Sequence, residues 1–161
     1  MSHIHPHSTA RVGGHPLHPM IVPFPIAFFL AALVSDVVYL SNGRSGFAEA
    51  SVWLIGAGLA AALLAAVLGL ADFLGDRMVR GMRTAWLHMV GNVLAVAIEA
   101  VSLYVRSTQG MEASVAPTGV TLSAVTAVIL LGTGWLGGEL VYRHGVGVDD
   151  ESLAPARVRD D

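Results

Sequence analysis

Four long apolar segments dominate the sequence and leave few folds open to the chain. They cover residues 20–40, 51–73, 84–105 and 121–142, and each is close to the roughly 20 apolar residues that a helix needs to cross a bilayer. Only 13% of all residues are charged, whereas soluble proteins carry about 25%. We therefore predict an all-α protein, an integral membrane four-helix bundle whose exterior contacts the lipid bilayer.

Polar termini divide the chain further. We predict a flexible N-terminal tail over residues 1–14, a four-helix transmembrane domain over residues 15–144 and a polar C-terminal tail over residues 145–161. Four prolines lie between residues 16 and 25, and proline interrupts a helix except in its first turn. We expect an irregular, Pro-rich segment over residues 15–24, with regular helix only from about Pro25.

The arginines predict the orientation of the bundle. With four spans, both termini and the second loop share one side of the membrane. Seven of the nine basic residues fall on that side, namely Arg11, Arg77, Arg80, Arg83, Arg143, Arg157 and Arg159. Because basic residues favour the cytoplasm, we predict that both termini are cytoplasmic.

Several polar residues should meet at this cytoplasmic end of the bundle. Ionisable side chains within spans are costly and therefore mark candidate functional sites. At about 1.5 Å rise per residue, the topology brings seven polar residues to one level. They are His15, His18, Asp72, His88, Asn92, Glu139 and His144. His88 and Asn92 share a helix face, and Glu139 is spaced to pair with Arg143.

Histidines in such a bundle are candidate ligands for haem or for a transition metal. His18, His88 and His144 could supply an axial pair for haem b, and His15 could join them around another metal. Asp72, Asn92 and Glu139 could orient the imidazoles. In such bundles haem ligands lie near mid-depth, so the position of these histidines near one membrane face is an argument against haem. The alternative is a structural role, in which the histidines bind carbonyl groups, helix ends or lipid headgroups.

A second group of acidic residues lies nearer the other face. Asp36 and Glu99 fall at similar depth, and two carboxyl groups that meet there would form a proton relay. Alternatively, each faces the outer headgroups or pairs with Arg106.

Two end motifs resemble a known family. His15-Pro16-Leu17-His18-Pro19 precedes the first span, and the string from Gly134 to Val148 ends the last. With Gly69…Asp72 and Arg83…His88…Asn92, they resemble the bacterial family called domain of unknown function 2231, over about residues 13–148. The resemblance implies a bacterial inner-membrane protein with the motif residues His15, His18, Asp36, Asp72, Arg83, His88, Asn92, Glu139 and His144. Some members are joined to a Rieske-type iron–sulfur domain, which implies a redox partner. This chain has no cysteine, so any such domain must belong to a separate protein.

The leading functional hypothesis is a redox-associated bundle that binds haem or a metal. The alternatives are a proton- or ion-conducting transporter subunit, and a passive anchor or assembly partner of a Rieske-type redox complex. Homo-oligomerisation would suit the transporter. No basic block suggests nucleic acid, and the hydrolase motifs GxSxG and HExxH are absent. The residues leave open whether the protein is an enzyme and identify no catalytic residue.

Overall fold

The computed structural model describes residues 6–148, and the predicted tails lie outside this range over residues 1–5 and 149–161. Four candidate membrane spans are present, at Leu17–Asn42, Ser45–Gly75, Arg83–Gln109 and Val115–Tyr142. The predicted four-helix membrane bundle is therefore confirmed, although each helix extends beyond its apolar segment into the flanking polar residues.

The elements follow a simple up-and-down order. The first span comprises α1 (Leu17–Ile21) and α2 (Pro23–Asn42), and α3 (Ser45–Gly75) returns beside it. The short helix α4 (Arg77–Gly81) leads to α5 (Arg83–Gln109). The π-helical turn η1 (Val115–Gly119) and α6 (Val120–Tyr142) complete the bundle.

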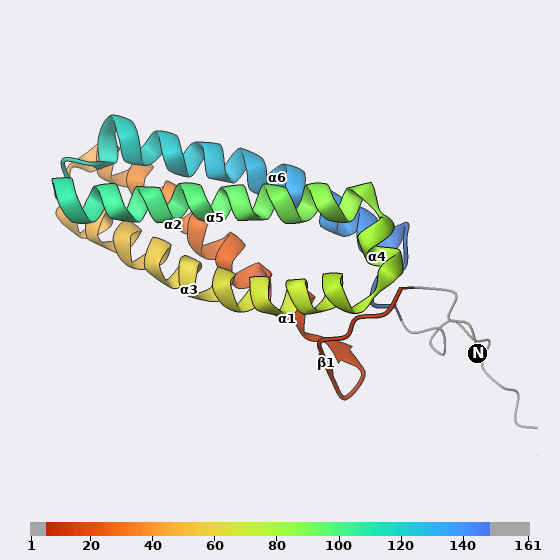
Figure 1. Cartoon of the computed structure of the whole chain (residues 1–161). Helices are drawn as coiled ribbons and strands as arrows, with labels where there is room; N and C mark the ends of the chain where they lie inside the picture. Colours follow the sequence, from red (N-terminus) through yellow and green to blue (C-terminus); the bar gives the residue numbers. More distant parts are fainter. Residues whose placement is uncertain (1–5, 149–161) are drawn as a thin grey trace, which may run out of the picture.

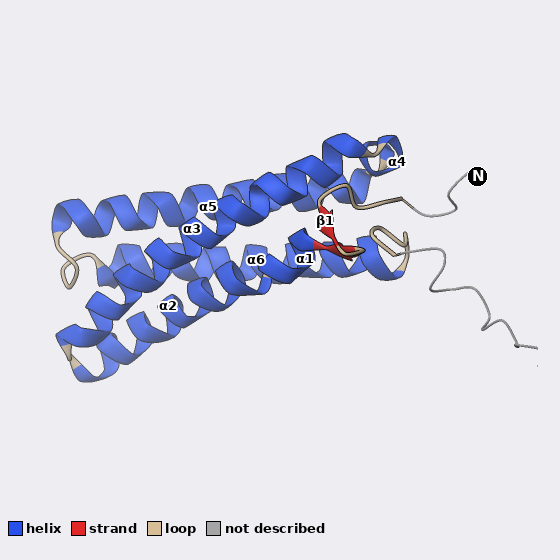
Figure 2. Ribbon diagram, turned by 90° about the horizontal axis from the view of Figure 1, so that it is seen from below, coloured by secondary structure: helices blue, strands red, loops and turns tan. Residues whose placement is uncertain are grey.

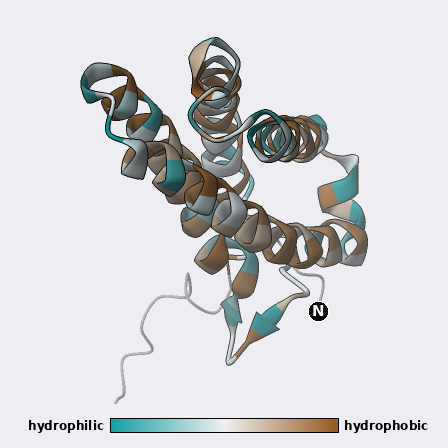
Figure 3. Ribbon diagram, turned by 90° about the vertical axis from the view of Figure 1, so that its left-hand side faces the viewer, coloured by the Kyte–Doolittle hydropathy of each residue, from teal (hydrophilic) through white to brown (hydrophobic). Residues whose placement is uncertain are grey.

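The helices form a ring, with α2 against α3, α3 against α5, α5 against α6 and α6 against α2. Figure 1 shows that both ends of the described chain lie at the same end of the bundle. We call this the terminal end, and the end with the loops after Asn42 and Gln109 the loop end. Figure 3, which faces the loop end, shows hydrophobic residues along all the long helices.

The Pro-rich segment bends the first span. α1 ends at Ile21, and α2 begins at Pro23, the position at which proline is best tolerated in a helix. The chain is helical from Leu17, eight residues before Pro25, so the irregular part of the expected segment 15–24 is limited to His15–Pro16 and to an interruption at Val22, whose φ and ψ of −51° and −36° are still helical.

Interior positions repeat every seven residues, as in a left-handed helix bundle. The repeat on α5 places polar and small side chains inward, at His88, Asn92, Ala95, Glu99, Ser102 and Arg106. On α6 the corresponding buried residues include Ser123, Thr126, Leu130 and Thr133. The seam between the helices is therefore unusually polar for a membrane protein.

One apolar layer interrupts this polar seam. It consists of one buried residue from each long helix, namely Phe29, Ala62, Ala95 and Leu130. Nine residues along the helices, or about 13 Å, separate this layer from exposed Trp53 and Tyr104 on the loop side and from Trp86 on the terminal side. Aromatic residues favour the two membrane interfaces, about 30 Å apart. We call Phe29, Ala62, Ala95 and Leu130 the central layer, because it lies near the middle of the bilayer.

Gly58 provides a test of helix packing. A Cβ atom at Gly58 would lie 2.5 Å from the Phe29 ring, whereas Gly56, half a turn away, has no heavy atom within 4 Å of such a Cβ. We expect Gly58→Leu to lower the free energy of unfolding in detergent by about 1–3 kcal/mol, because overpacking separates α2 from α3. Gly56→Leu is the matched control and should leave stability unchanged or slightly higher. Equal denaturation midpoints for the two variants would contradict this packing.

Candidate functional site: a histidine pair and a buried ion pair

His18 on α1 and His88 on α5 lie next to each other inside the terminal half of the bundle. Their ring centroids are 6.4 Å apart and their ring planes are nearly perpendicular, at 86°. The two residues are 70 positions apart in the sequence, and both imidazoles are half-buried. The structure therefore brings together two of the four predicted histidine ligands.

Each imidazole of this pair is fixed by a backbone carbonyl of a neighbouring helix. The Nδ1 atom of His18 lies 2.8 Å from the carbonyl oxygen of Ala65 on α3. The Nδ1 atom of His88 lies 2.8 Å from the carbonyl oxygen of Thr133 on α6. A carbonyl oxygen only accepts, so Nδ1 donates in both residues and the neutral ring has its free electron pair on Nε2. Neither Nε2 atom has a hydrogen-bond partner among residues 6–148.

Two glycines make room for the rings. A Cβ atom at Gly69 would lie 2.8 Å from the His18 ring, and one at Gly137 would lie 3.0 Å from the His88 ring. Each imidazole therefore packs against the backbone of the helix that accepts its hydrogen bond, which restricts its orientation.

Asn92 stabilises the same layer without contacting an imidazole nitrogen. Its Nδ2 atom donates to the carbonyl oxygen of His88 at 2.7 Å, and its Oδ1 atom accepts from the Thr133 hydroxyl at 3.3 Å. The second of these bonds links α5 to α6 beside the carbonyl that holds His88.

Asp72 binds the N-terminal segment, not a histidine. Its Oδ1 atom accepts from the Ser8 hydroxyl at 2.9 Å, from Thr9 N at 2.7 Å and from Ala10 N at 2.8 Å. Asp76 accepts from His7 N at 2.9 Å. We call residues 6–10 the strap. The expected tail over residues 1–14 thus includes a segment with specific contacts to the end of α3, while residues 1–5 lie outside the described range.

A short hairpin connects the strap to α1. Strands β1 (Arg11–Val12) and β2 (His15–Pro16) pair across Gly13 and Gly14, which both have positive φ, as a two-residue hairpin loop requires. Figure 2 shows the hairpin at the terminal end. His15 is exposed there, and its Nδ1 atom contacts the carbonyl of Gly13 at 3.0 Å.

The remaining predicted site residues stay apart from the histidine pair. Glu139 pairs with exposed Arg143 at 3.5 Å, as the spacing predicted, and His144 follows the end of α6. Among residues 6–148 no group of three or more His, Cys, Asp or Glu side chains could hold a metal ion. The predicted layer of seven is therefore reduced to His18, His88 and Asn92.

In the loop half, Asp36 and Arg106 form a fully buried ion pair. The guanidinium donates to both carboxylate oxygens, at 3.0 and 2.6 Å. Arg106 Nε also donates to Ser102 Oγ at 3.3 Å, and Ser123 Oγ donates to Asp36 at 3.5 Å. A Cβ atom at Gly119 would lie 2.6 Å from the guanidinium, so this glycine makes room for it.

Asp36 pairs with Arg106, which is the alternative that the sequence left open for this residue. Glu99 remains without a hydrogen-bond partner among the described residues, although it is completely buried.

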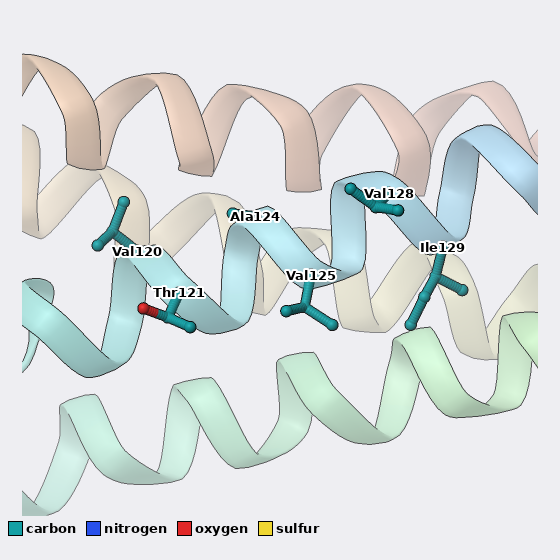
Figure 4. Close-up of a pocket in the computed structure, with 6 residues that line it drawn as sticks. All are labelled: Val120, Thr121, Ala124, Val125, Val128 and Ile129. Carbon is teal, nitrogen blue, oxygen red and sulfur yellow. The ribbon is translucent and has the colours of Figure 1, made fainter.

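Figure 4 shows a shallow groove on α6, lined by Val120, Thr121, Ala124, Val125, Val128 and Ile129. Most of these side chains are aliphatic, and the histidine pair and the buried ion pair contribute no side chain to the groove. It is a lipid-facing hollow, separate from both polar sites.

Comparison with known proteins agrees with this architecture. A family model described as predicted membrane protein (DUF2231) matches residues 14–150. The chain belongs to this family. No curated protein and no solved structure gives a significant match. The DUF2231 match covers all four spans, the histidine pair and the buried ion pair, so both sites lie within the family domain.

Sequence reasoning missed the groups that hold the imidazoles. The acceptors on Ala65 and Thr133 are backbone carbonyls, which no side-chain motif reveals. Gly69 and Gly137 belonged to motifs that the sequence shows. Their presence, with one glycine beside each imidazole, was the available signal.

Proposed function

We propose that this DUF2231 protein is a membrane redox protein in which His18 and His88 bind a single haem through their Nε2 atoms. The observation that carries the proposal is the pair of imidazoles from different helices, each with Nδ1 bonded to a carbonyl and Nε2 unpartnered. A carbonyl partner on the second nitrogen is the usual arrangement for histidines that ligate metals.

The separation of the rings is close to that expected for two imidazoles that would hold one haem between them. Metal–nitrogen bonds of about 2 Å, and about 1 Å from each nitrogen to its ring centre, would place two such rings about 6 Å apart. The observed separation is 6.4 Å.

The size of the donor set favours haem over an ion bound by protein alone. A structural or catalytic zinc site uses three or four protein ligands, and residues 6–148 contain no such group. Haem needs only axial ligands from the chain, since the porphyrin supplies the others. When bound, haem would supply one-electron chemistry, while the carbonyls of Ala65 and Thr133 would keep the imidazoles oriented.

Depth in the membrane also supports this site. Ala65 and Thr133 each lie three residues from the central layer, or about 5 Å toward the terminal end. The imidazoles therefore lie closer to the middle of the bilayer than the sequence indicated. This weakens the argument against haem that rested on a position near one membrane face. We further propose that the terminal end faces the cytoplasm of a bacterial cell and that a separate iron–sulfur protein exchanges electrons with the site.

Purified protein tests the proposal directly. We expect protein made with added haem, in mild detergent, to show the visible spectrum of a haem with two imidazole ligands, at one haem per chain. His18→Ala and His88→Ala should each lose this spectrum. His15→Ala is the matched control, because His15 is exposed in the hairpin, and it should keep full occupancy.

Failure of the proposal would be plain. Wild-type protein that remains free of haem after reconstitution, while circular dichroism reports an intact helical fold, would refute it. Equal haem content in wild type and in His88→Ala would also refute it.

A further inference from the structure

Glu99 is a buried acid that the proposed redox site does not use. The residue lies on α5, and its exposed fraction is 0%. Neither carboxyl oxygen has a hydrogen-bond partner within the described part of the chain. It is one turn from Ala95 of the central layer, which places it about 6 Å toward the loop end of the bundle.

Among residues 6–148, the one positive charge near Glu99 is already paired with Asp36. The electrostatic neighbours of Glu99 are Thr126, Arg106 and Asp36. Arg106 is the single cation of this group, and it directs both terminal nitrogens at Asp36 and Nε at Ser102. The Thr126 hydroxyl is close enough to interact with the carboxyl, but the pair is outside hydrogen-bond geometry.

Each helix around Glu99 can be considered in turn. In the loop half, the buried titratable residue of α2 is Asp36, which is already paired, and the buried polar side chains of α6 are Ser123 and Thr126. The buried side chains of α3 in this half are Ala48, Ser51 and Ile55, none of which titrates. One guanidinium therefore faces two carboxyl groups, and burial of an unpaired carboxylate is strongly unfavourable.

We infer that Glu99 is a proton-binding site, which carries a proton at neutral pH while Asp36 stays ionised against Arg106. A neutral Glu99 balances the buried charges, since one cation then faces one anion. A metal cation fits less well than a proton, because the described residues contain no group of three or more His, Cys, Asp or Glu side chains that could hold one.

The layers of the bundle also indicate the side from which the proton exchanges. Toward the terminal end, the central layer of Phe29, Ala62, Ala95 and Leu130 contains no polar side chain. Toward the loop end, Ser102, Ser123 and the Asp36–Arg106 pair offer donors and acceptors. Proton exchange with Glu99 therefore proceeds through the loop end.

Infrared spectroscopy distinguishes the two states of the carboxyl group. The chain has five glutamates, Glu49, Glu99, Glu112, Glu139 and Glu151. With ¹³C-labelled glutamate at pH 7, we expect one isotope-shifted C=O band of a protonated carboxyl, and we expect Glu99→Gln to abolish it. Glu139→Gln is the matched control, because Glu139 is half-buried beside Arg143, and it should lose carboxylate absorption instead.

The outcomes are decisive in either direction. A labelled protein with carboxylate bands alone would overturn the inference, and so would a protonated band that survives in Glu99→Gln. If that variant does not fold, the wild-type spectrum still decides, because Glu99 is the single fully buried glutamate among the described residues. Either result leaves the haem proposal unaffected, since the two sites share no residue.

Discussion

Replacing Asp36 with alanine should lower the free energy of unfolding by about 3–5 kcal/mol, the usual cost of leaving one partner of a buried ion pair alone. Arg106 would then lose both carboxylate bonds while its guanidinium remained charged and completely buried. Arginine cannot escape this cost by losing a proton, although ionisation of Glu99 would offset part of it. The measurement is the denaturation midpoint of purified protein in mixed detergent micelles.

Two further variants separate charge from packing. Arg106→Leu should cost less than Asp36→Ala, because an unpaired aspartate can take up a proton. The double variant Asp36→Leu/Arg106→Leu should recover most of the lost stability, since apolar residues often replace buried ion pairs without loss.

The pair of half-buried Glu139 and exposed Arg143 is the matched control. Glu139→Gln should change stability by less than about 1 kcal/mol, because exposed ion pairs contribute little. If Asp36→Ala and Glu139→Gln unfold at the same denaturant concentration, the buried pair does not have the stabilising role assigned to it.

Asp72→Ala should release the strap from the terminal end. The substitution removes the acceptor of Ser8 Oγ, Thr9 N and Ala10 N. Hydrogen bonds to a charged group contribute about 1.5–3 kcal/mol each. Loss of at least two of them should raise the amide exchange rate of Thr9 and Ala10 on the order of 100-fold, at about 1.4 kcal/mol per factor of ten.

Hydrogen exchange followed by mass spectrometry measures this effect. Thr9→Val is the control, because it removes the hydroxyl bonds to Ala71 and Asp72 but leaves both amide bonds to Asp72. It should raise exchange far less than Asp72→Ala. Unchanged protection in Asp72→Ala would show that the carboxylate does not hold the strap.

The four spans were predictable because apolar length alone identifies membrane helices. Local spacing was also reliable, since residues four apart on one helix share a face. The Glu139–Arg143 pair and the placement of Asn92 beside His88 both follow from this rule. The start of the first span was less predictable, because several prolines could each have begun the helix.

Depth was a weaker guide to contacts between helices. It placed His18 and His88 at one level with His15, Asp72 and Glu139, but it could not show which residues face the interior. Asp72 turns to the strap and His15 lies in the hairpin, a structure formed by a Gly-Gly turn that apolar patterning does not reveal. The iron–sulfur partner, the homo-oligomer and the cytoplasmic position of the termini remain predictions.

The central layer has a consequence for how the two halves of the protein can communicate. His88 and Glu99 belong to the same helix, about 16 Å apart along its axis, yet an apolar plane lies between them. No chain of hydrogen-bonding side chains crosses that plane within the described residues. The two halves therefore share no side-chain route for a proton across this plane, and coupling between electron and proton chemistry must act through the electric field in the low-dielectric interior or through a displacement of α5.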